Sequence, residues 1–547
     1  MGDLLVFAGG GILACLFLNK AFARFGVPSL LAFIALGMLF GEDGPLGINF
    51  TNFELCEHVC TVGLVFIMFY GGFGTRWSEA RPYAAESALL ASVGTVATAG
   101  VVATGAHVVL GTPWPQSFLL GSLISSTDAA SVFSVLRARR LNLKDGLASV
   151  LEVESGSNDP FAYLLTFIAL LVLGGTATPV MVATTLVAQL LIGAGVGAAI
   201  AWLALLLLDR MSERDETLSC VLLIACALLS FSVPDMVGGN GFLSVYLTGI
   251  IIGNSRQLHG KTVVVHFFDG LTHIGQIVIF FLFGLLSTPS EMLGVLPQGL
   301  TVFAVLTLVA RPVATVLAGR PFGRSWAQVG FVAAAGLRGA ASLTFSLMAL
   351  EGMSRAGLAT SFALYHTVLW VVVLSILTQG MALPYVARRL GLVDDTQSVM
   401  RTFTDYEEMS DYSLLELPVH AGGSWAGRAV RDVNFPNGFL VMLVRRGDQS
   451  IVPHGDTVLE VGDRLVISAP TYTPAPAAML RGDTPLRELF LDEAHPWVGR
   501  TLAEVPLSPT GVAVLVRRGG DSIVPRGATR LLAGDVVVYS GTLPPDA

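Results

Sequence analysis

The sequence predicts a mainly α-helical, polytopic membrane protein that ends in a small α/β tail, and two observations carry this prediction. The chain of 547 residues is 53% hydrophobic and only 13% charged, whereas soluble domains carry about 25% charged residues. Apolar stretches recur up to residue 390, and the composition then changes to an acidic segment followed by alternating, strand-like runs. We therefore expect a membrane domain at 1–390 and a separate domain after it.

About thirteen of these stretches approach the length that crosses a bilayer, roughly 20 residues. They lie near 3–19, 27–41, 58–73, 83–110, 117–136, 146–173, 180–208, 217–233, 241–254, 263–286, 299–319, 326–350 and 357–387. Lys and Arg concentrate in the cytoplasmic loops of membrane proteins, and those before residue 390 occupy alternate loops except Arg311, Arg338 and Arg355. This pattern predicts an N-terminus outside and a cytoplasmic tail. Arg311-Pro312 is interpreted as a kink or as a side chain that reaches the inner surface.

The sixth stretch is interrupted by a polar run, Glu152-Val-Glu-Ser-Gly-Ser-Asn-Asp-Pro160. A charge at membrane depth costs about 3 kcal/mol or more, so Glu154 and Asp159 indicate a path for ions or protons. Ser155 and Asp159 are four residues apart and share a helix face, as do Glu154 and Asn158. The alternative is that these polar groups only join helices, but two aspartates, a glutamate and an arginine in the interrupted stretches disfavour it.

Two other stretches carry related interruptions. Residues 125–132 read Ser-Ser-Thr-Asp-Ala-Ala-Ser-Val, and residues 336–343 read Gly-Leu-Arg-Gly-Ala-Ala-Ser-Leu. The two segments are seven crossings apart, so they traverse the membrane in opposite directions, as inverted repeats require. Transporters built from such repeats bind ions at discontinuous helices near the midplane. Chance similarity among small, helix-packing residues is the alternative.

These motifs together resemble those of the monovalent cation:proton antiporters, in particular the NhaP-like branch with an Asn-Asp pair. The resemblance rests on Glu154 to Pro160, on Ser126-Thr127-Asp128 and on Gly336-Leu-Arg-Gly339, and it covers roughly residues 1–390. It implies an NhaA-like fold of about thirteen helices in two inverted repeats, and a homodimer.

The resemblance also implies roles for individual residues. Asp159 would bind the cation and the proton, with Asp128 beside it. Thr127 and Ser155 would contribute oxygens, and Asn158 would position the unwound segment. Arg338 would pair with Glu154. One departure concerns the third stretch, where relatives often carry an acidic residue and this chain has Phe69-Tyr70-Gly71-Gly72, which leaves sodium selectivity open.

Exchange follows from competition at one carboxylate. In a partly dehydrated cavity, a proton and an alkali cation compete for the charge of Asp159. If Arg338 and Glu154 neutralise each other, one proton replaces one cation, and exchange is electroneutral unless Asp128 also titrates.

The tail contains a tandem repeat at an offset of 72 residues. Trp425-Ala-Gly-Arg428 recurs as Trp497-Val-Gly-Arg500, Leu443-Val-Arg-Arg-Gly447 as Leu515-Val-Arg-Arg-Gly519, Ser450-Ile-Val-Pro453 as Ser522-Ile-Val-Pro525, and Gly462-Asp463 as Gly534-Asp535. Two β-rich runs flank an Arg-Gly turn in each unit, which predicts a hairpin over Phe439 to Arg445 and Ser450 to Pro453. Each unit resembles the RCK-C module, also called TrkA-C.

We therefore divide the tail into an acidic linker (391–412), a first RCK-C-like module (413–470), a Pro-rich linker (471–484) and a second module (485–543). The modules are candidates for binding a nucleotide or another small ligand. Anionic ligands would contact the arginines that flank the turns: Arg445, Arg446, Arg517 and Arg518. The alternative is that these arginines are solvated or form salt bridges.

The sequence as a whole predicts an inner-membrane antiporter that exchanges potassium, or sodium, for protons and is regulated by its tail. A tail-gated cation channel is the competing class, but we find no pore loop with a selectivity-filter sequence. We expect no enzyme and no cofactor, because no nucleophile and base pair is evident. The net charge of -8 and the lack of clustered Lys and Arg disfavour nucleic acid as a partner.

Overall fold

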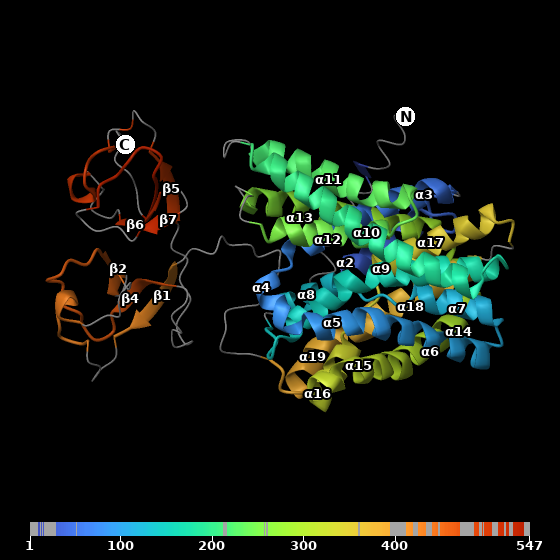
Figure 1. The fold of residues 1–547 in the computed structure, drawn as a ribbon. Helices are drawn as coiled ribbons and strands as arrows, with labels where there is room; N and C mark the ends of the chain where they lie inside the picture. The colour runs from blue at the N-terminus through green and yellow to red at the C-terminus, as the bar shows by residue number, and fades with distance from the viewer. Residues whose placement is uncertain are drawn as a thin grey trace. The chain divides into compact units, whose positions relative to one another are not determined.

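The computed structural model describes most of the membrane domain and the strands of the tail. Described are residues 9–10, 13, 15, 29–50, 52–139, 141–211, 216–255, 258, 261–358, 362–393, 412–419, 425–433, 440–446, 449–470, 486–491, 495, 497–505, 512–518, 521–523 and 529–540. The chain forms two compact units, Met1–Tyr406 and Glu407–Ala547. Figure 1 shows that the first unit is helical and that strands are confined to the second.

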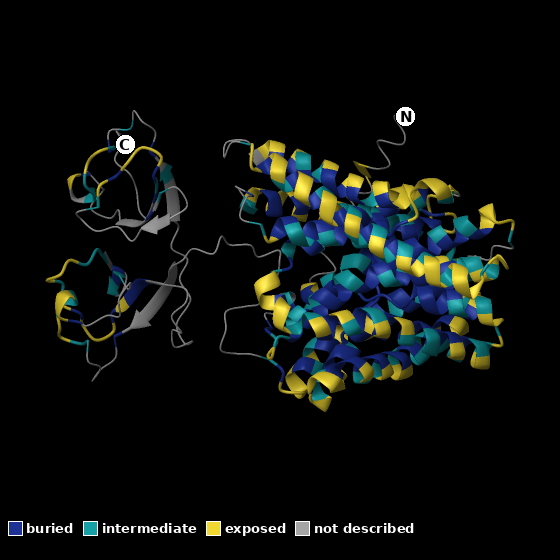
Figure 2. Cartoon of the chain, in the orientation of Figure 1, coloured by how far each residue is buried: buried dark blue, intermediate teal, exposed yellow. Residues whose placement is uncertain are grey.

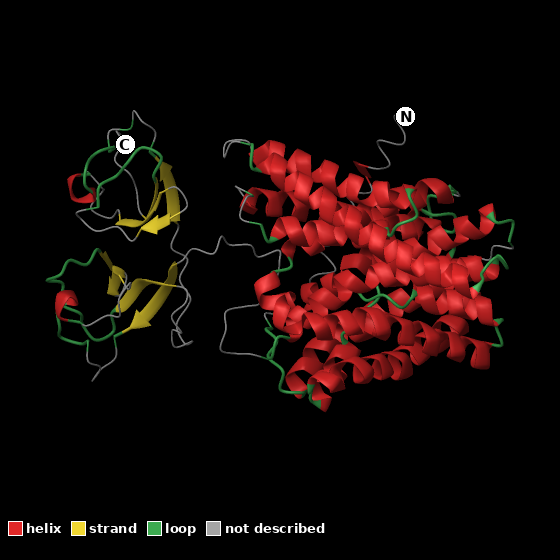
Figure 3. Cartoon of the chain, viewed as in Figure 1, coloured by secondary structure: helices red, strands yellow, loops and turns green. Residues whose placement is uncertain are grey.

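The first unit is a bundle of helices (Figure 3). Its helices are α2 (Ser29–Phe40), α3 (Phe53–Gly74), α4 (Trp77–Ala80), α5 (Ala84–Leu89), α6 (Thr95–Leu110), α7 (Trp114–Leu123), α8 (Ala129–Ala138), α9 (Leu147–Leu173), α10 (Pro179–Leu208), α11 (Glu216–Met236), α12 (Gly241–Gly253), α13 (Lys261–Leu286), α14 (Pro289–Val305), α15 (Arg311–Gly319), α16 (Trp326–Ala334), α17 (Ala340–Arg355), α18 (Phe362–Leu374) and α19 (Met381–Arg389). In the described part of the chain, eight continuous helices are long and apolar enough to cross a membrane.

The other predicted crossings correspond to shorter or broken helices. Helices α2 and α12 are apolar but short, and the stretches near 117–136 and 326–350 are divided into α7 with α8 and α16 with α17. The first predicted stretch, near 3–19, lies mostly outside the described residues. The count of thirteen therefore stays a prediction, whereas a mainly helical, polytopic fold is confirmed.

The outer surface of the bundle exposes large apolar side chains. Helix α10 exposes Val180, Leu191 and Trp202 by 73%, 68% and 65%, and Figure 2 shows exposed residues along the outer faces of the helices. Contiguous apolar patches on the surface of a soluble protein mark an interaction surface. On a helix long enough to span a bilayer, exposed apolar side chains of this kind are expected.

The same order of elements occurs twice. Two 34-residue spans, Trp77–Leu110 and Pro289–Phe322, each contain a π-helical turn, at Leu90–Gly94 and at Leu306–Ala310. Each span is followed by a broken helix, α7 with α8 or α16 with α17, and then by a long crossing. This recurrence matches the repeat predicted from the two related polar segments.

The two breaks contact each other. Backbone N–H of Asp128, which caps α8, donates a hydrogen bond of 2.9 Å to the carbonyl oxygen of Leu337. Gly339 caps α17, and an added Cβ there would lie 2.1 Å from Oδ2 of Asp128. The glycine is therefore required by the close approach of the Asp128 side chain.

The tail contains two four-stranded antiparallel sheets. The first has the order β1-β4-β2-β3 and the second β5-β8-β6-β7. The strands are β1 (Tyr412–Pro418), β2 (Leu440–Arg446), β3 (Gln449–Ile451), β4 (Arg464–Pro470), β5 (Leu486–Phe490), β6 (Val512–Arg518), β7 (Asp521–Ile523) and β8 (Val536–Ser540). Strands β2 and β3 form the predicted hairpin. Both sheets shift register at the equivalent place, Val441/Leu443 and Ala513/Leu515.

Candidate ion-binding site

One face of α9 borders a cavity inside the bundle. Glu152, Ser155, Gly156 and Asp159 all line it, and their spacing of three, four and seven residues places them on one side of a helix. The cavity has a volume of about 90 Å³. A single water molecule needs about 10–15 Å³ on this measure, so the cavity accommodates several waters or a partly hydrated cation.

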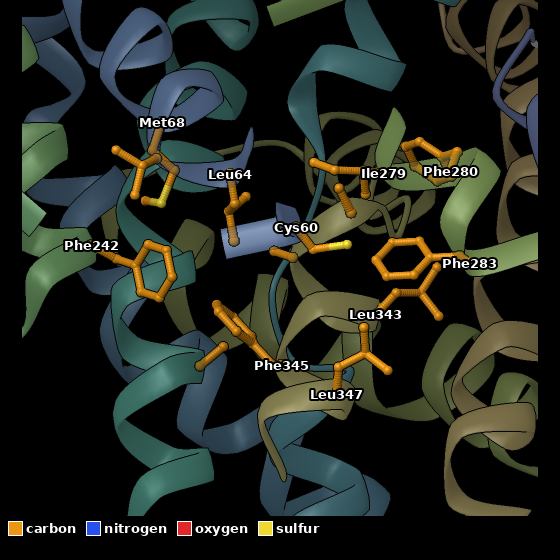
Figure 4. Packing of buried hydrophobic residues seen from close by; sticks show 14 of the residues in the cluster. Cys60, Leu64, Met68, Phe242, Ile279, Phe280, Phe283, Leu343, Phe345 and Leu347 are labelled. Carbon is orange, nitrogen blue, oxygen red and sulfur yellow. The ribbon is translucent and has the colours of Figure 1, made fainter. Parts of the chain in front are cut away.

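Five other segments complete the wall. The two helix breaks contribute polar residues from Ser126 to Asp128 and small ones from Gly339 to Ala341, and Tyr246 and Gln276 add further polar groups. The remaining wall is apolar and comes mainly from α3 and α13. In Figure 4, Leu64, Met68 and Phe280 from this wall lie within a dense apolar cluster. The cavity is therefore a small, mainly apolar space into which α9 and the two helix breaks bring a few polar groups.

Beyond Asp159, the core is aromatic. Tyr163, one turn further along α9, packs edge-on against Phe242 at 5.2 Å between ring centroids. Phe242 packs in turn against Phe345 at 5.5 Å. Neither Phe242 nor Phe345 lines the cavity, so this cluster closes α9 on the side away from Glu152.

Asp159 has an oxygen without a partner. Its side chain is 9% exposed, and within the described part of the chain its Oδ1 atom is buried with no hydrogen bond. Asp128 differs, because its Oδ2 accepts from Ser131 Oγ at 2.5 Å and its Oδ1 from Ser131 N at 3.2 Å. Asp128 is thus held as the N-cap of α8. Of these two aspartates, Asp159 is the one with a carboxyl oxygen that lacks a hydrogen-bond donor in the described part of the chain.

Asn158 and Ser155 on α9 hydrogen-bond the non-helical segment at residues 125–128, between α7 and α8. Asn158 Nδ2 donates to Thr127 Oγ1 at 2.6 Å, and Thr127 N donates to Asn158 Oδ1 at 3.3 Å. Ser155 Oγ donates to the Thr127 carbonyl oxygen and accepts from Ala129 N, both at 2.8 Å. These bonds satisfy backbone groups that the helix break leaves without helical partners.

The expected pair of Arg338 with Glu154 is wrong. Glu154 Oε1 instead accepts from Arg311 Nη1 at 2.8 Å, and the two side chains are 1% and 2% exposed. Arg311 is therefore not a side chain that reaches the inner surface; the π-helical turn Leu306–Ala310 ends directly before it. Gly336 makes this possible, because an added Cβ there would lie 2.3 Å from Arg311 Nε.

Arg338 hydrogen-bonds backbone carbonyl groups instead of Glu154. Its Nη1 donates to the carbonyl oxygens of Ser125, at 3.0 Å, and of Ser126. Its backbone N–H donates to Ser375 Oγ at 3.0 Å. The break between α7 and α8 leaves carbonyls without helical donors, and a guanidinium supplies several donors in a fixed geometry. Arg338 thus stabilises one helix break from the other.

Three residues at the site were missed by sequence reasoning: Glu152, Tyr246 and Arg311. The helical spacing from Asp159 back to Glu152 places both on one face, so this signal was present in the sequence. Arg311 and Tyr246 gave no such signal, because their partners lie on distant helices.

Comparison with known proteins shows which family this chain belongs to. Residues 11–389 match the family model described as the transmembrane sodium/hydrogen exchanger. The chain belongs to the sodium/hydrogen exchanger family. The tail of this exchanger matches the TrkA-C domain twice, at 414–471 and 486–542. These matches confirm the resemblance drawn from the polar motifs and from the tandem repeat.

Similar proteins are found across the length of the exchanger. A K(+)/H(+) antiporter NhaP2 from Shewanella sp. (strain MR-4) is 32% identical over 466 residues, which cover 84% of this chain and 80% of that one. A K(+)/H(+) antiporter NhaP from Alkalimonas amylolytica is 36% identical over 68% of this chain and 64% of that one. The structure of the sodium proton antiporter MjNhaP1 from Methanocaldococcus jannaschii superposes with a TM-score of 0.63 at 20% identity, over 71% of this chain and 99% of that one. The last likeness supports the fold.

The exchanger carries Tyr70 where the sequence analysis noted a missing acidic residue. Its hydroxyl donates to Asp269 Oδ1 on α13 at 3.4 Å. The next residue, Gly71, lines the cavity, whereas Tyr70 does not. The third helix therefore adds no carboxylate to the cavity wall.

The tail arginines are used within their own modules. Arg446 makes two bonds of 2.8 Å to Asp463 and one of 2.5 Å to Glu460. Arg518 makes the equivalent two bonds of 2.8 Å to Asp535. Hydrogen bonds from Arg446 hold the pKa of Asp463 below its usual value. These contacts favour the salt-bridge interpretation for Arg446 and Arg518. The side chain of Arg517 lies outside the described residues, and Arg445 follows Val444 in β2.

Proposed function

We propose that this exchanger trades a potassium ion for a proton by alternating access, with Asp159 as the shared site and Asp128, Thr127 and Ser155 around it. The observation that carries the proposal is the buried Oδ1 atom of Asp159, which has no hydrogen-bond partner in the described part of the chain, on a residue that lines the cavity. A carboxylate withdrawn from water must be neutralised. A cation and a proton can each do so, but not both together, and this competition couples their movements.

Potassium is favoured over sodium by two observations. The relatives at 32% and 36% identity carry the name K(+)/H(+) antiporter. In addition, α3 contributes Gly71 and no acidic side chain to the cavity wall. A smaller and more strongly hydrated cation such as sodium requires more charge at the site to replace its water.

The charges support a one-for-one exchange. The Arg311 and Glu154 pair is neutral as a unit. Arg338 Nη1 donates to the carbonyl oxygen of Ser126, a residue of the cavity wall, and we assign its positive charge to offset one of the two aspartates. The remaining negative charge is neutralised by one cation or by one proton, and the cycle moves no net charge.

We propose the membrane location, orientation and oligomeric state of the exchanger from its loop charges and its family. Alternating Lys and Arg loops support an inner-membrane protein with the N-terminus outside and the tail in the cytoplasm. Membership of the family supports a homodimer in the bilayer. The paired TrkA-C domains support regulation of exchange by a small ligand, and the long apolar helices support direct contact with lipid.

The test is proton flux in vesicles that contain the purified protein. A pulse of potassium, sodium or lithium chloride should move protons, with potassium effective at the lowest concentration. Asp159→Asn should abolish the flux while the protein stays folded, whereas Asp209→Asn, on an exposed residue, should leave it unchanged. Setting the membrane potential with an ionophore should not alter the rate. Potassium movement without proton movement would instead identify a channel.

A further inference from the structure

Three buried polar atoms in the cavity share one property. Glu152 Oε1, Tyr246 Oη and Asp159 Oδ1 all lack a hydrogen-bond partner within the described part of the chain. All three residues line the same cavity. Tyr246 is only 4% exposed, so its hydroxyl cannot be satisfied by bulk solvent. Groups of this kind are costly inside a membrane protein unless they bind something.

The helix places the two carboxylates in sequence along the cavity. Glu152 and Asp159 are seven residues apart on α9, which is two turns, or about 10 Å along the axis. Glu152 lies nearer the start of α9 and Asp159 nearer the aromatic cluster of Tyr163, Phe242 and Phe345. An ion that reaches Asp159 from the start of α9 therefore passes Glu152 first.

Tyr246 lies at the level between them. A Cβ added to Gly156 would lie 2.3 Å from Tyr246 Cε2 and 2.7 Å from its Oη. Gly156 thus admits the tyrosine ring against α9, one turn after Glu152 and one turn before Asp159. The hydroxyl oxygen is available as a ligand halfway along the path.

The charge of Glu152 is not cancelled by a paired base in the described structure. Arg76, which contributes a positive charge near Glu152, lies 3.2 Å from Glu79 in an exposed pair. Glu154, two residues further on, is neutralised by Arg311 on the other side of α9. Glu152 is therefore a second acidic side chain in the cavity, separate from the Asp159 and Asp128 pair, and it can hold either a proton or a cation.

We propose that Glu152 and Tyr246 form a second site for the transported monovalent cation, which holds the ion before it reaches Asp159. The carboxylate supplies charge, and the phenol oxygen replaces one water ligand. The site raises the local cation concentration on the side of the cavity where α9 begins. It rests on the proposed function, because it loads the same Asp159.

The consequence is a one-sided change in apparent affinity. Removing the charge of Glu152 weakens capture of the cation from one membrane face but leaves the exchange step at Asp159 intact. We expect Glu152→Gln to raise the apparent KM for potassium about tenfold, which corresponds to about 1.4 kcal/mol, for potassium added at one face only. The maximal rate should stay within about threefold, because an interaction that acts only in binding affects KM rather than kcat.

The experiment uses the full chain reconstituted with a uniform orientation and titrated with potassium chloride from each face. Glu152→Asp should restore most of the affinity, and Tyr246→Phe, which removes only the hydroxyl, should give a smaller shift on the same face. Asp209→Asn is the control, since it removes an exposed carboxylate outside the cavity. Thermal melting checks that each variant is folded.

The outcomes separate this site from the proposed function. An unchanged KM, or an equal shift at both faces, in a folded Glu152→Gln protein overturns the second site. Complete loss of exchange in that folded variant also overturns it, because Glu152 would then be as essential as Asp159. If the wild-type protein shows no cation-dependent proton flux, or if Asp159→Asn retains it, the proposed function fails instead.

Discussion

Arg311 on α15 forms a buried ion pair with Glu154 on α9, with 2.8 Å between Nη1 and Oε1. The pair joins the second repeat to the helix that carries Asp159. Arg311 Nη2 also donates to the Val332 carbonyl oxygen at 3.2 Å, so one side chain connects α9, α15 and α16. The pair removes Glu154 from the charge balance of the cavity and leaves Arg338 to stabilise the break between α7 and α8.

We expect Arg311→Ala to lower the free energy of unfolding by about 3–5 kcal/mol, because it leaves Glu154 buried without a counter-charge. The double variant Arg311→Met with Glu154→Leu should lose far less, since an apolar pair of similar volume has no unpaired charge. Thermal melting in detergent measures both. A double variant as unstable as the single one would show that the ion pair is not the cause.

The second prediction concerns the close contact between Gly339 and the Asp128 carboxylate. Gly339→Ala should reduce exchange about 100-fold, because the added methyl group would displace the Asp128 carboxylate by about 1 Å or more. Gly330→Ala is a matched control in the neighbouring helix α16, since nothing lies within 4 Å of an added Cβ there. Proton flux in vesicles compares the two. Near-normal exchange by Gly339→Ala would mean that the position of Asp128 does not matter.

The first tail module should depend on pH through Asp463. Hydrogen bonds from Arg446 lower the pKa of this carboxyl in the folded state, so the ionised form stabilises the module. This stability is present above the unfolded pKa of about 3.9 and is lost as the pH falls through the folded value.

Hydrogen exchange of strands β2 and β4 in the full chain measures the effect. Asp463→Asn should weaken protection at neutral pH by about 1–3 kcal/mol, the cost of leaving buried donors without their acceptor. Asp456→Asn, an exposed carboxylate in the same module, should have little effect. Unchanged protection in Asp463→Asn would show that the pair with Arg446 does not hold the module together.

Truncation tests the division between transport and regulation. A protein that ends after Val393 keeps the described site and all helices up to α19, and the two compact units of the chain divide beyond that point. We expect it to exchange ions with an altered pH dependence or apparent affinity, because a regulatory module biases states that the membrane domain already visits.

Adenine nucleotides, as the first ligands to try, should alter proton flux by the full-length protein and not by the truncated one. Complete loss of exchange in a folded truncated protein would make the tail an obligatory part of transport.

Several features could be predicted from residue patterns alone. The membrane fold follows from apolar length, the tandem modules follow from repeated motifs such as Trp425 and Trp497, and the polar run around Asp159 follows from its cost in a bilayer. The related segments around Asp128 and Gly339 were also visible as a sequence pattern. The resemblance to the cation:proton antiporters rested on the order of these motifs, and the family match confirmed the resemblance.

The sequence by itself determined which residues are polar within the membrane and which helix carries them, because those properties are local and periodic. Only the tertiary structure decided which basic side chain pairs with Glu154. Arg311 and Arg338 both lie in apolar stretches of the second repeat, and nothing in their spacing distinguishes a partner for Glu154. The choice depends on the crossing of the two helix breaks, which directs Arg338 to the Ser125 and Ser126 carbonyls, and on the space that Gly336 leaves for Arg311. Ion pairing over such separations is a property of helix packing, which a linear pattern does not encode.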